Sequence, residues 1–242
     1  MGGESGLTSN TPGQQLALPV NLEVEPSFAN YYLPEDSPNL QATRCLYQMA
    51  CGNGEVVAFI WGGAGVGLSH LLQACASHAS ATGVAAHYAS LAGGLAPSEL
   101  NELNPTALLC IDDVDVVAGK PEWERAVFHA FNRIKDQGGR IIFASHTPPN
   151  TLAVGLPDLL SRLLWGPVYQ LVPLDDAAKV RALQLQAHSL GMQIGEDVAQ
   201  YVVNHSPRGL ASLFAVLARL DQETLVSKRR LTIPFIKQVL EL

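Results

Sequence analysis

The chain has 242 residues, of which 48% are hydrophobic and 15% are charged, and its formal net charge at pH 7 is −7. A chain of this length can bury about 70–75% of its unfolded surface, so we expect a globular protein with room for two unequal domains. The composition excludes a disordered chain. The acidic balance argues against autonomous binding of duplex DNA, which needs an excess of Lys and Arg against the phosphates.

The first twenty residues differ in composition from the rest of the chain. They are rich in Gly, Ser, Thr, Pro and Gln and have no amphipathic period, so we expect a mobile tail over residues 1–20. One short apolar patch interrupts this tail, with the residues Gln15, Leu16, Ala17, Leu18, Pro19 and Val20. A polar anchor followed by spaced apolar side chains suits docking in a groove on a folded partner. The alternative is a first strand packed on the domain, which Pro19 disfavours.

Apolar β-like runs then alternate with helical patterns. The runs cover residues 56–62, 85–92, 107–114, 140–146 and 168–174. Between the third and fourth runs, the segment after Pro121 repeats Trp123, Val127, Phe131 and Ile134 on one helical face and ends at a Gly pair. This alternation predicts an α/β fold, with a parallel sheet that carries helices on both faces.

Beyond Pro173 the strand signal stops. Helical patterns follow over residues 175–190, 196–205, 209–227 and 233–241. The sequence therefore predicts a flexible tail over residues 1–20, a nucleotide-binding core over 21–173 and a small all-helical domain over 174–242.

A glycine-rich segment follows the first apolar run and precedes an apolar helix. Its residues are Gly62, Gly63, Ala64, Gly65, Val66, Gly67, Leu68 and Ser69. Glycines at this spacing let backbone N–H groups turn toward phosphates, and the helix N-terminus adds the positive end of its dipole. The pattern indicates a phosphate-binding loop, while an ordinary glycine-rich strand–helix turn remains the alternative.

Two acidic residues, Asp112 and Asp113, end the third apolar run. In a parallel sheet this end lies beside the phosphate-binding loop. Asp112 could hold Mg²⁺ through water while the Ser69 hydroxyl serves as a ligand. The alternative is a solvated turn with a helix cap.

Leu68 stands where such a loop has a lysine that meets the β- and γ-phosphates. Backbone donors alone can cradle a diphosphate, but the extra charge of a γ-phosphate would be poorly compensated. We therefore expect the site to hold ADP, with or without Mg²⁺, and to hydrolyse ATP very slowly or not at all.

The remaining chemistry-bearing residues suggest no further site. The four cysteines have no CxxC spacing and the seven histidines have no zinc-ligand spacing, so we expect reduced, structural side chains. The start of the chain has no basic or apolar segment of a secretion signal, and no stretch is typical of a membrane span. We expect a cytoplasmic protein without membrane contact; self-association stays open.

Taken in order, the QLALPV patch, the lysine-free loop followed by SHLL, and the segment LPDLLSRLLWG resemble the DnaA-related AAA+ replication-initiator family. The resemblance covers nearly the whole chain. It implies a P-loop AAA+ core with a helical lid, a nucleotide held by residues 62–69, and Asp112 and Asp113 as the Walker B pair. It further implies that Ser145 is the sensor 1 residue and Arg208 the sensor 2 arginine. Without the resemblance, Arg208 would be interpreted as a solvated or capping arginine at a helix start. His146 departs from the aspartate that the family has at that position.

The resemblance also assigns Arg162 as an arginine finger that points at the nucleotide of a neighbouring protein. A trans arginine stabilises charge on the transferring phosphoryl group, and it stays useful in a chain whose own loop lacks lysine. The alternative role is an i,i+4 surface ion pair with Asp158. Phe28, Tyr31 or Tyr32 is expected near the nucleobase, although core packing is the commoner role of an aromatic cluster.

The resemblance names two partners. The tail would bind the DNA polymerase III sliding clamp, its β subunit, although Val20 replaces the expected Leu. Arg162 would promote hydrolysis of ATP on DnaA, and this would restrain initiation of DNA replication. Two alternatives stay open: a self-sufficient AAA+ motor, which Leu68 disfavours, and a DNA-binding loader, which the acidic charge and the expected end of the chain after the lid disfavour.

Overall fold

A computed structural model describes residues 25–103, 108–207, 209–227 and 231–240. Their secondary structure is, in chain order, α1 (Leu40–Ala50), β1 (Val57–Trp61), α2 (Leu68–Ala81), β2 (Ala86–Ser90), α3 (Pro97–Glu102), β3 (Leu108–Asp112), α4 (Val114–Val117), α5 (Pro121–Asp136), β4 (Arg140–Ser145), the 3₁₀ helix η1 (Pro149–Thr151), α6 (Pro157–Leu163), β5 (Val168–Gln170), α7 (Asp176–Ser189), α8 (Glu196–His205), α9 (Leu210–Ser227) and α10 (Ile233–Leu240).

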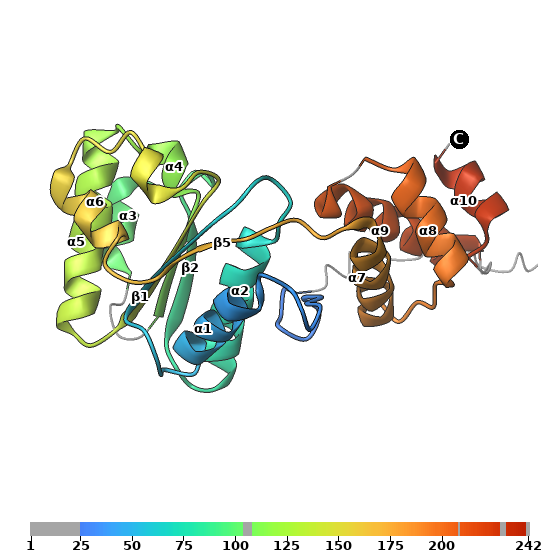
Figure 1. The fold of residues 1–242 in the computed structure, drawn as a ribbon, viewed down its shortest axis with the longest axis horizontal. Coiled ribbons are helices and arrows are strands. Elements are labelled where there is room, and N and C mark those ends of the chain that lie inside the picture. The colour runs from blue at the N-terminus through green and yellow to red at the C-terminus, as the bar shows by residue number, and fades with distance from the viewer. Residues whose placement is uncertain (1–24, 104–107, 208, 228–230, 241–242) are drawn as a thin grey trace, which may run out of the picture.

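The described strands form a five-stranded parallel sheet in the order β2-β3-β4-β1-β5. Helices cover both faces: α1 and α2 pack on one, and α3, α5 and α6 on the other (Figure 1). This α/β architecture is the predicted one. Because all strands run the same way, the carboxyl ends of β1, β3 and β4 meet at one edge.

The strands form because nearly every side chain in them is buried. In β1, Val57 and Phe59 join the core under α5, whereas Ala58 and Ile60 join the core under α2. β3 and β4 alternate in the same way. A strand that buries both faces appears in the sequence as a continuous apolar run, and the predictions over 56–62, 107–114 and 140–146 depend on that signal.

Several elements differ from the expected ones, since α1, α3, α4 and η1 were not predicted and β5 is shorter than expected. β5 has three residues where residues 168–174 were expected, because it lies at the sheet edge and pairs only with β1. Pro173 lacks the N–H that a longer ladder would need. α1 was not predicted at all, although it buries Leu46 and Met49 completely.

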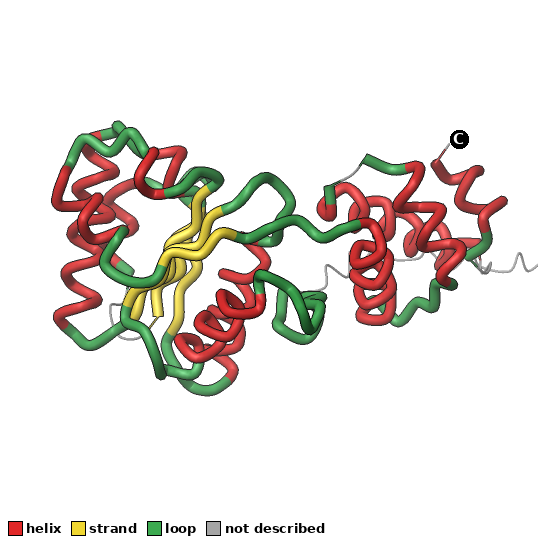
Figure 2. The backbone as a smooth tube through the Cα atoms, in the orientation of Figure 1, coloured by secondary structure: helices red, strands yellow, loops and turns green. Residues whose placement is uncertain are grey.

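The C-terminal part is a helical lid domain built from α7 to α10. Its own core includes Leu183, Val202, Leu213 and Ile236, each fully buried. One connecting segment links β5 to α7 (Figure 2). The expected boundary at 173–174 falls within that segment and stays a proposal.

The four cysteines are free, and Cys45, Cys75 and Cys110 are buried. Within the described ranges, no helix has the length and apolar character needed to cross a membrane.

Candidate functional site

The segment 62–69 is a tight loop that joins β1 to α2. Gly65 and Gly67 have φ values of 78° and 95°, in the left-handed region that glycine adopts without strain. A Cβ on Gly67 would lie 2.9 Å from Cε2 of Tyr31, so this position also needs glycine for space. The loop therefore has the backbone form of a phosphate cradle, open at the N-terminus of α2.

A cavity of about 270 Å³ lies over this loop, between the core and the lid. The core side includes Gly63, residues 65–70 and His146, with Tyr31 and Tyr32 beside them. The lid side consists of Ala182 on α7 and Leu210, Ala211 and Phe214 on α9. A Cβ on Gly65 would lie 3.7 Å from the backbone nitrogen of Leu210, so the first turn of α9 lies beside the loop.

The described lining of this cavity includes no Lys or Arg. Leu68 is 5% exposed and packs in the core cluster under α1 and α2, so no charge stands at the usual lysine position. Instead, the N-termini of two long helices, α2 and α9, meet at the cavity. Their dipoles and the N–H groups of their first turns favour binding of an anion. The positive charge that they supply is smaller than that of a lysine side chain.

Tyr31 closes one wall of the cavity. Its ring lies 5.5 Å from the His70 ring, and Nε2 of His70 is 3.0 Å from the carbonyl oxygen of Ser27, which ties residues 27–31 to α2. Burial lowers the pKa of His70 and raises that of Tyr31 to about 12. Tyr31 and Tyr32 thus line the cavity, whereas Phe28 packs against Tyr47 and His78.

Asp112 lies beneath the loop rather than in the cavity lining. It is 1% exposed, and its carboxylate accepts hydrogen bonds from the Tyr88 hydroxyl at 2.9 Å and from the Asp113 N–H at 3.0 Å. Asp113 is the N-cap residue of α4, with a φ of 61°, but its side chain makes no capping bond and instead accepts a bond from the Ser90 hydroxyl at 2.6 Å. The side-chain cap that was considered as an alternative is therefore absent at Asp113.

Tyr88 is a residue of the site that the sequence analysis missed. Its hydroxyl donates to Asp112, and burial is the main cause that raises its pKa to about 12, with smaller effects from Gln73 and Ser69. Tyr88 therefore lies near both expected Mg²⁺ ligands as a neutral phenol. Its place in a β-like run gave no signal for this role.

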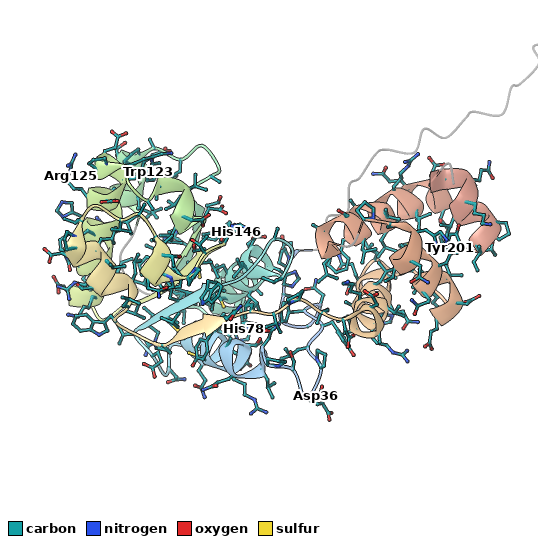
Figure 3. All side chains as sticks on the ribbon, turned by 45° about the horizontal axis from the view of Figure 1, so that its top comes forward. Asp36, His78, Trp123, Arg125, His146 and Tyr201 are labelled. Carbon is teal, nitrogen blue, oxygen red and sulfur yellow. The ribbon has the colours of Figure 1, made fainter. Side chains whose placement is uncertain are left out.

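Ser145 ends β4 and is fully buried, with its hydroxyl accepting the Thr147 N–H at 3.1 Å. The next residue, His146, lines the cavity instead. Asp115 holds it, because Oδ1 accepts the His146 backbone N–H at 3.0 Å and Oδ2 lies 3.8 Å from the ring Nδ1. Figure 3 shows His146 between the part of the core that holds Trp123 and the lid that holds Tyr201.

Arg162 lies on α6, which packs on the opposite face of the sheet from α2 (Figure 1). Its guanidinium carbon is 4.9 Å from the ring centroid of Trp165 and 5.6 Å from that of Phe131. Among the described residues no ion pair includes Arg162, so the considered pair with Asp158 is absent there. Its Nε is buried and has no hydrogen-bond partner. Arg162 is not among the residues that line the cavity.

The structure brings together the loop, the tyrosines and His146, with Asp112, Asp113 and Ser145 just beneath. Arg208 and the patch over residues 15–20 lie outside the described residues. The lid residues Ala182, Leu210, Ala211 and Phe214 were missed, because their place at the cavity depends on tertiary packing.

Two family models match the chain. The model of the Hda lid domain matches residues 176–240, and that of the bacterial DnaA ATPase domain matches residues 98–170. The chain is an AAA+ protein related to Hda and DnaA.

Solved structures agree on the fold of this DnaA-related protein. Domain III of the replication initiation protein DnaA from Thermotoga maritima has a TM-score of 0.75 at 23% identity, over 89% of this chain and 95% of that one. AMPPCP-bound DnaA from Aquifex aeolicus has a TM-score of 0.65 at 23% sequence identity, over 84% of this chain and 68% of that one. The Holliday junction branch migration motor RuvB from Thermotoga maritima has a TM-score of 0.66 at 15% sequence identity, over 89% of this chain and 71% of that one.

Proposed function

We propose that this AAA+ protein restrains initiation of DNA replication by stimulating hydrolysis of the ATP bound to DnaA. Residues 15–20 bind the sliding clamp, and Arg162 acts as the arginine finger on the nucleotide of DnaA. The product, ADP-bound DnaA, is inactive for initiation. The protein works as an adaptor and has little or no ATPase activity of its own.

One observation carries this proposal: the chain separates a cation-poor nucleotide cavity from an arginine with no carboxylate partner among the described residues. Leu68 removes the charge that hydrolysis in cis requires. Arg162 keeps a guanidinium held by two aromatic rings, on the opposite face of the sheet from α2. A trans arginine is worth on the order of 10³–10⁵ in rate, so a chain with this division of features suits activation of a partner.

The resident nucleotide in this proposal is ADP. Glycines with positive φ at positions 65 and 67, together with the N-termini of α2 and α9, supply backbone donors for a diphosphate. Ser69, Asp112, Asp113, Ser145 and Arg208 complete the proposed site. The Tyr88 hydroxyl already donates to Asp112 and lies near Ser69, where it competes with a Mg²⁺ ion held by these two residues, so we propose that ADP binds with little dependence on Mg²⁺.

The test measures ATP hydrolysis by DnaA with and without clamp loaded on DNA. Wild-type protein should stimulate hydrolysis only with loaded clamp. Arg162→Ala should abolish stimulation, and a Gln15→Ala/Leu18→Ala variant should abolish it as well, because it cannot bind the clamp. Arg125→Ala is the matched control, because Arg125 is an exposed arginine on α5. Stimulation that persists without clamp, or in the tail variant, would refute the adaptor role.

A further inference from the structure

A buried carboxylate lies between α5 and the segment that leads into α6. Glu124, in the first turn of α5, is 2% exposed. Its Oε1 accepts the N–H groups of Gly119 at 2.7 Å and Gly155 at 2.9 Å, and its Oε2 accepts that of Leu156 at 2.8 Å. A buried carboxylate is costly unless it is fully hydrogen-bonded, so this arrangement depends on all three donors.

The three donors come from two separate loops. Gly119 lies between α4 and α5, with a φ of 81°, and a Cβ there would lie 3.3 Å from the carbonyl oxygen of Ala153. Gly155 and Leu156 immediately precede α6, and Leu156 is its N-cap residue. Glu124 therefore fixes the loop 118–120 and the segment 153–156 to α5 and to each other.

α6 depends on such contacts for its position. It has seven residues, too few for a helix that is stable by itself, and its N-cap residue makes no side-chain capping bond. Leu159 and Leu163 pack in the core and set which face of the helix is buried. Glu124 fixes the point where the helix begins. It thereby fixes the position of Arg162 in the last turn of the same helix.

We propose that Glu124 is a positioning residue for Arg162: its carboxylate anchors the start of α6 and so holds the guanidinium where it meets the nucleotide of the partner. This inference rests on the proposed function of Arg162. Glu124 touches neither the nucleotide nor the partner. Its effect is on the orientation of the finger.

The test variant is Glu124→Gln, which keeps size and shape. A glutamine offers one acceptor oxygen and places N–H donors opposite at least one of the three backbone N–H groups. The matched control is Glu122→Gln, because Glu122 lies in the same helical turn and is exposed.

The first readout is amide hydrogen exchange of the free protein, followed residue by residue by NMR. In wild type, the amides of Gly155 and Leu156 should be protected. In Glu124→Gln, these amides and those of α6 should exchange at least about ten-fold faster, while β1, β3 and β4 and ADP binding stay as in wild type. If the wild-type amides of Gly155 and Leu156 exchange like unstructured backbone, the proposal is overturned, whether or not the variant folds.

The second readout is DnaA ATP hydrolysis with loaded clamp. Glu124→Gln should lower the maximal stimulation about ten-fold and leave the half-saturating concentration unchanged, since a misplacement of about 1 Å costs up to ~10²-fold in rate. The double variant Glu124→Gln/Arg162→Ala should be no worse than Arg162→Ala alone, because both changes affect one interaction.

The outcomes separate the two proposals. A wild-type level of stimulation by Arg162→Ala would refute the proposed function itself. If Arg162→Ala is inactive as expected, undiminished stimulation by Glu124→Gln overturns only the positioning role. A rise in half-saturating concentration without loss of maximal stimulation would overturn it too, since that pattern means weaker docking.

Discussion

Position 68 determines the charge balance of the nucleotide cavity. The loop backbone around it keeps the left-handed glycines of a phosphate cradle, but Leu68 is buried in the core and the described lining of the cavity holds no Lys or Arg. Backbone N–H groups and helix dipoles remain as the anion-binding elements. Because they carry partial charges only, they compensate a diphosphate better than a triphosphate.

Restoring the lysine should shift nucleotide preference. Leu68→Lys should raise the affinity for ATP relative to ADP roughly ten-fold or more, because a charge-assisted hydrogen bond to the γ-phosphate contributes about 1.5–3 kcal/mol. Isothermal calorimetry with both nucleotides measures the ratio. Leu68→Met is the control for volume, and its ratio should equal that of wild type. An unchanged ratio in Leu68→Lys would mean that another cation already meets the γ-phosphate.

At the scale of elements, α5 and α6 together present Arg162. Trp165 follows α6 and is 52% exposed, yet its ring holds two cations, with Lys135 Nζ at 4.3 Å and the Arg162 guanidinium at 4.9 Å from its centroid. Each such contact at an exposed site contributes about 0.5–1 kcal/mol. The ring therefore restricts the guanidinium, whose Nε is buried.

Removing the Trp165 ring should reduce the effect of Arg162 on DnaA ATP hydrolysis without unfolding the protein. Trp165→Ala should lower the stimulation of DnaA ATP hydrolysis about three- to five-fold, which corresponds to the loss of one cation–π contact. Trp165→Phe should retain most of the stimulation, since a smaller ring still faces the cation. Thermal unfolding and ADP binding should stay close to wild type in both. Equal stimulation by all three proteins would show that the Trp165 stacking does not orient Arg162.

The elements differ in how well the sequence predicts them. β1, β3 and β4 were predicted from continuous apolar runs, because strands buried on both faces leave that signal. α1 was missed, and β5 was predicted too long because pairing at a sheet edge depends on the neighbouring strand. At the site, the loop was predicted from its glycine spacing. Tyr88 and the lid residues were not, because only tertiary packing places them there.

At the scale of the whole molecule, the cavity joins the core to the lid. The first turn of α9 lies beside the phosphate-binding loop, so a bound nucleotide would contact both domains. We propose that bound ADP holds the lid and core in one orientation. By linkage, ADP at 100 times its Kd should add about 2.7 kcal/mol to the stability of the protein.

A charge placed on the lid tests this arrangement. Ala211 is exposed on α9 and lines the cavity, so Ala211→Glu should lower ADP affinity about ten-fold through repulsion of the phosphates. Ala218→Glu is the matched control, because Ala218 is exposed on the same helix but does not line the cavity. Fluorescence titration with a labelled ADP measures both. Equal affinities in the two variants would place the phosphates away from α9.

The most direct test of a trans arginine finger is single-turnover hydrolysis of labelled ATP preloaded on DnaA. Clamp is loaded on DNA, and this protein carries unlabelled ADP. Wild type should release labelled ADP from DnaA at least about 10³-fold faster than Arg162→Ala, the lower range for a trans arginine. Release at the same rate with both proteins would contradict a finger supplied in trans by Arg162. Turnover of ATP by this protein alone, without DnaA, would contradict the adaptor itself.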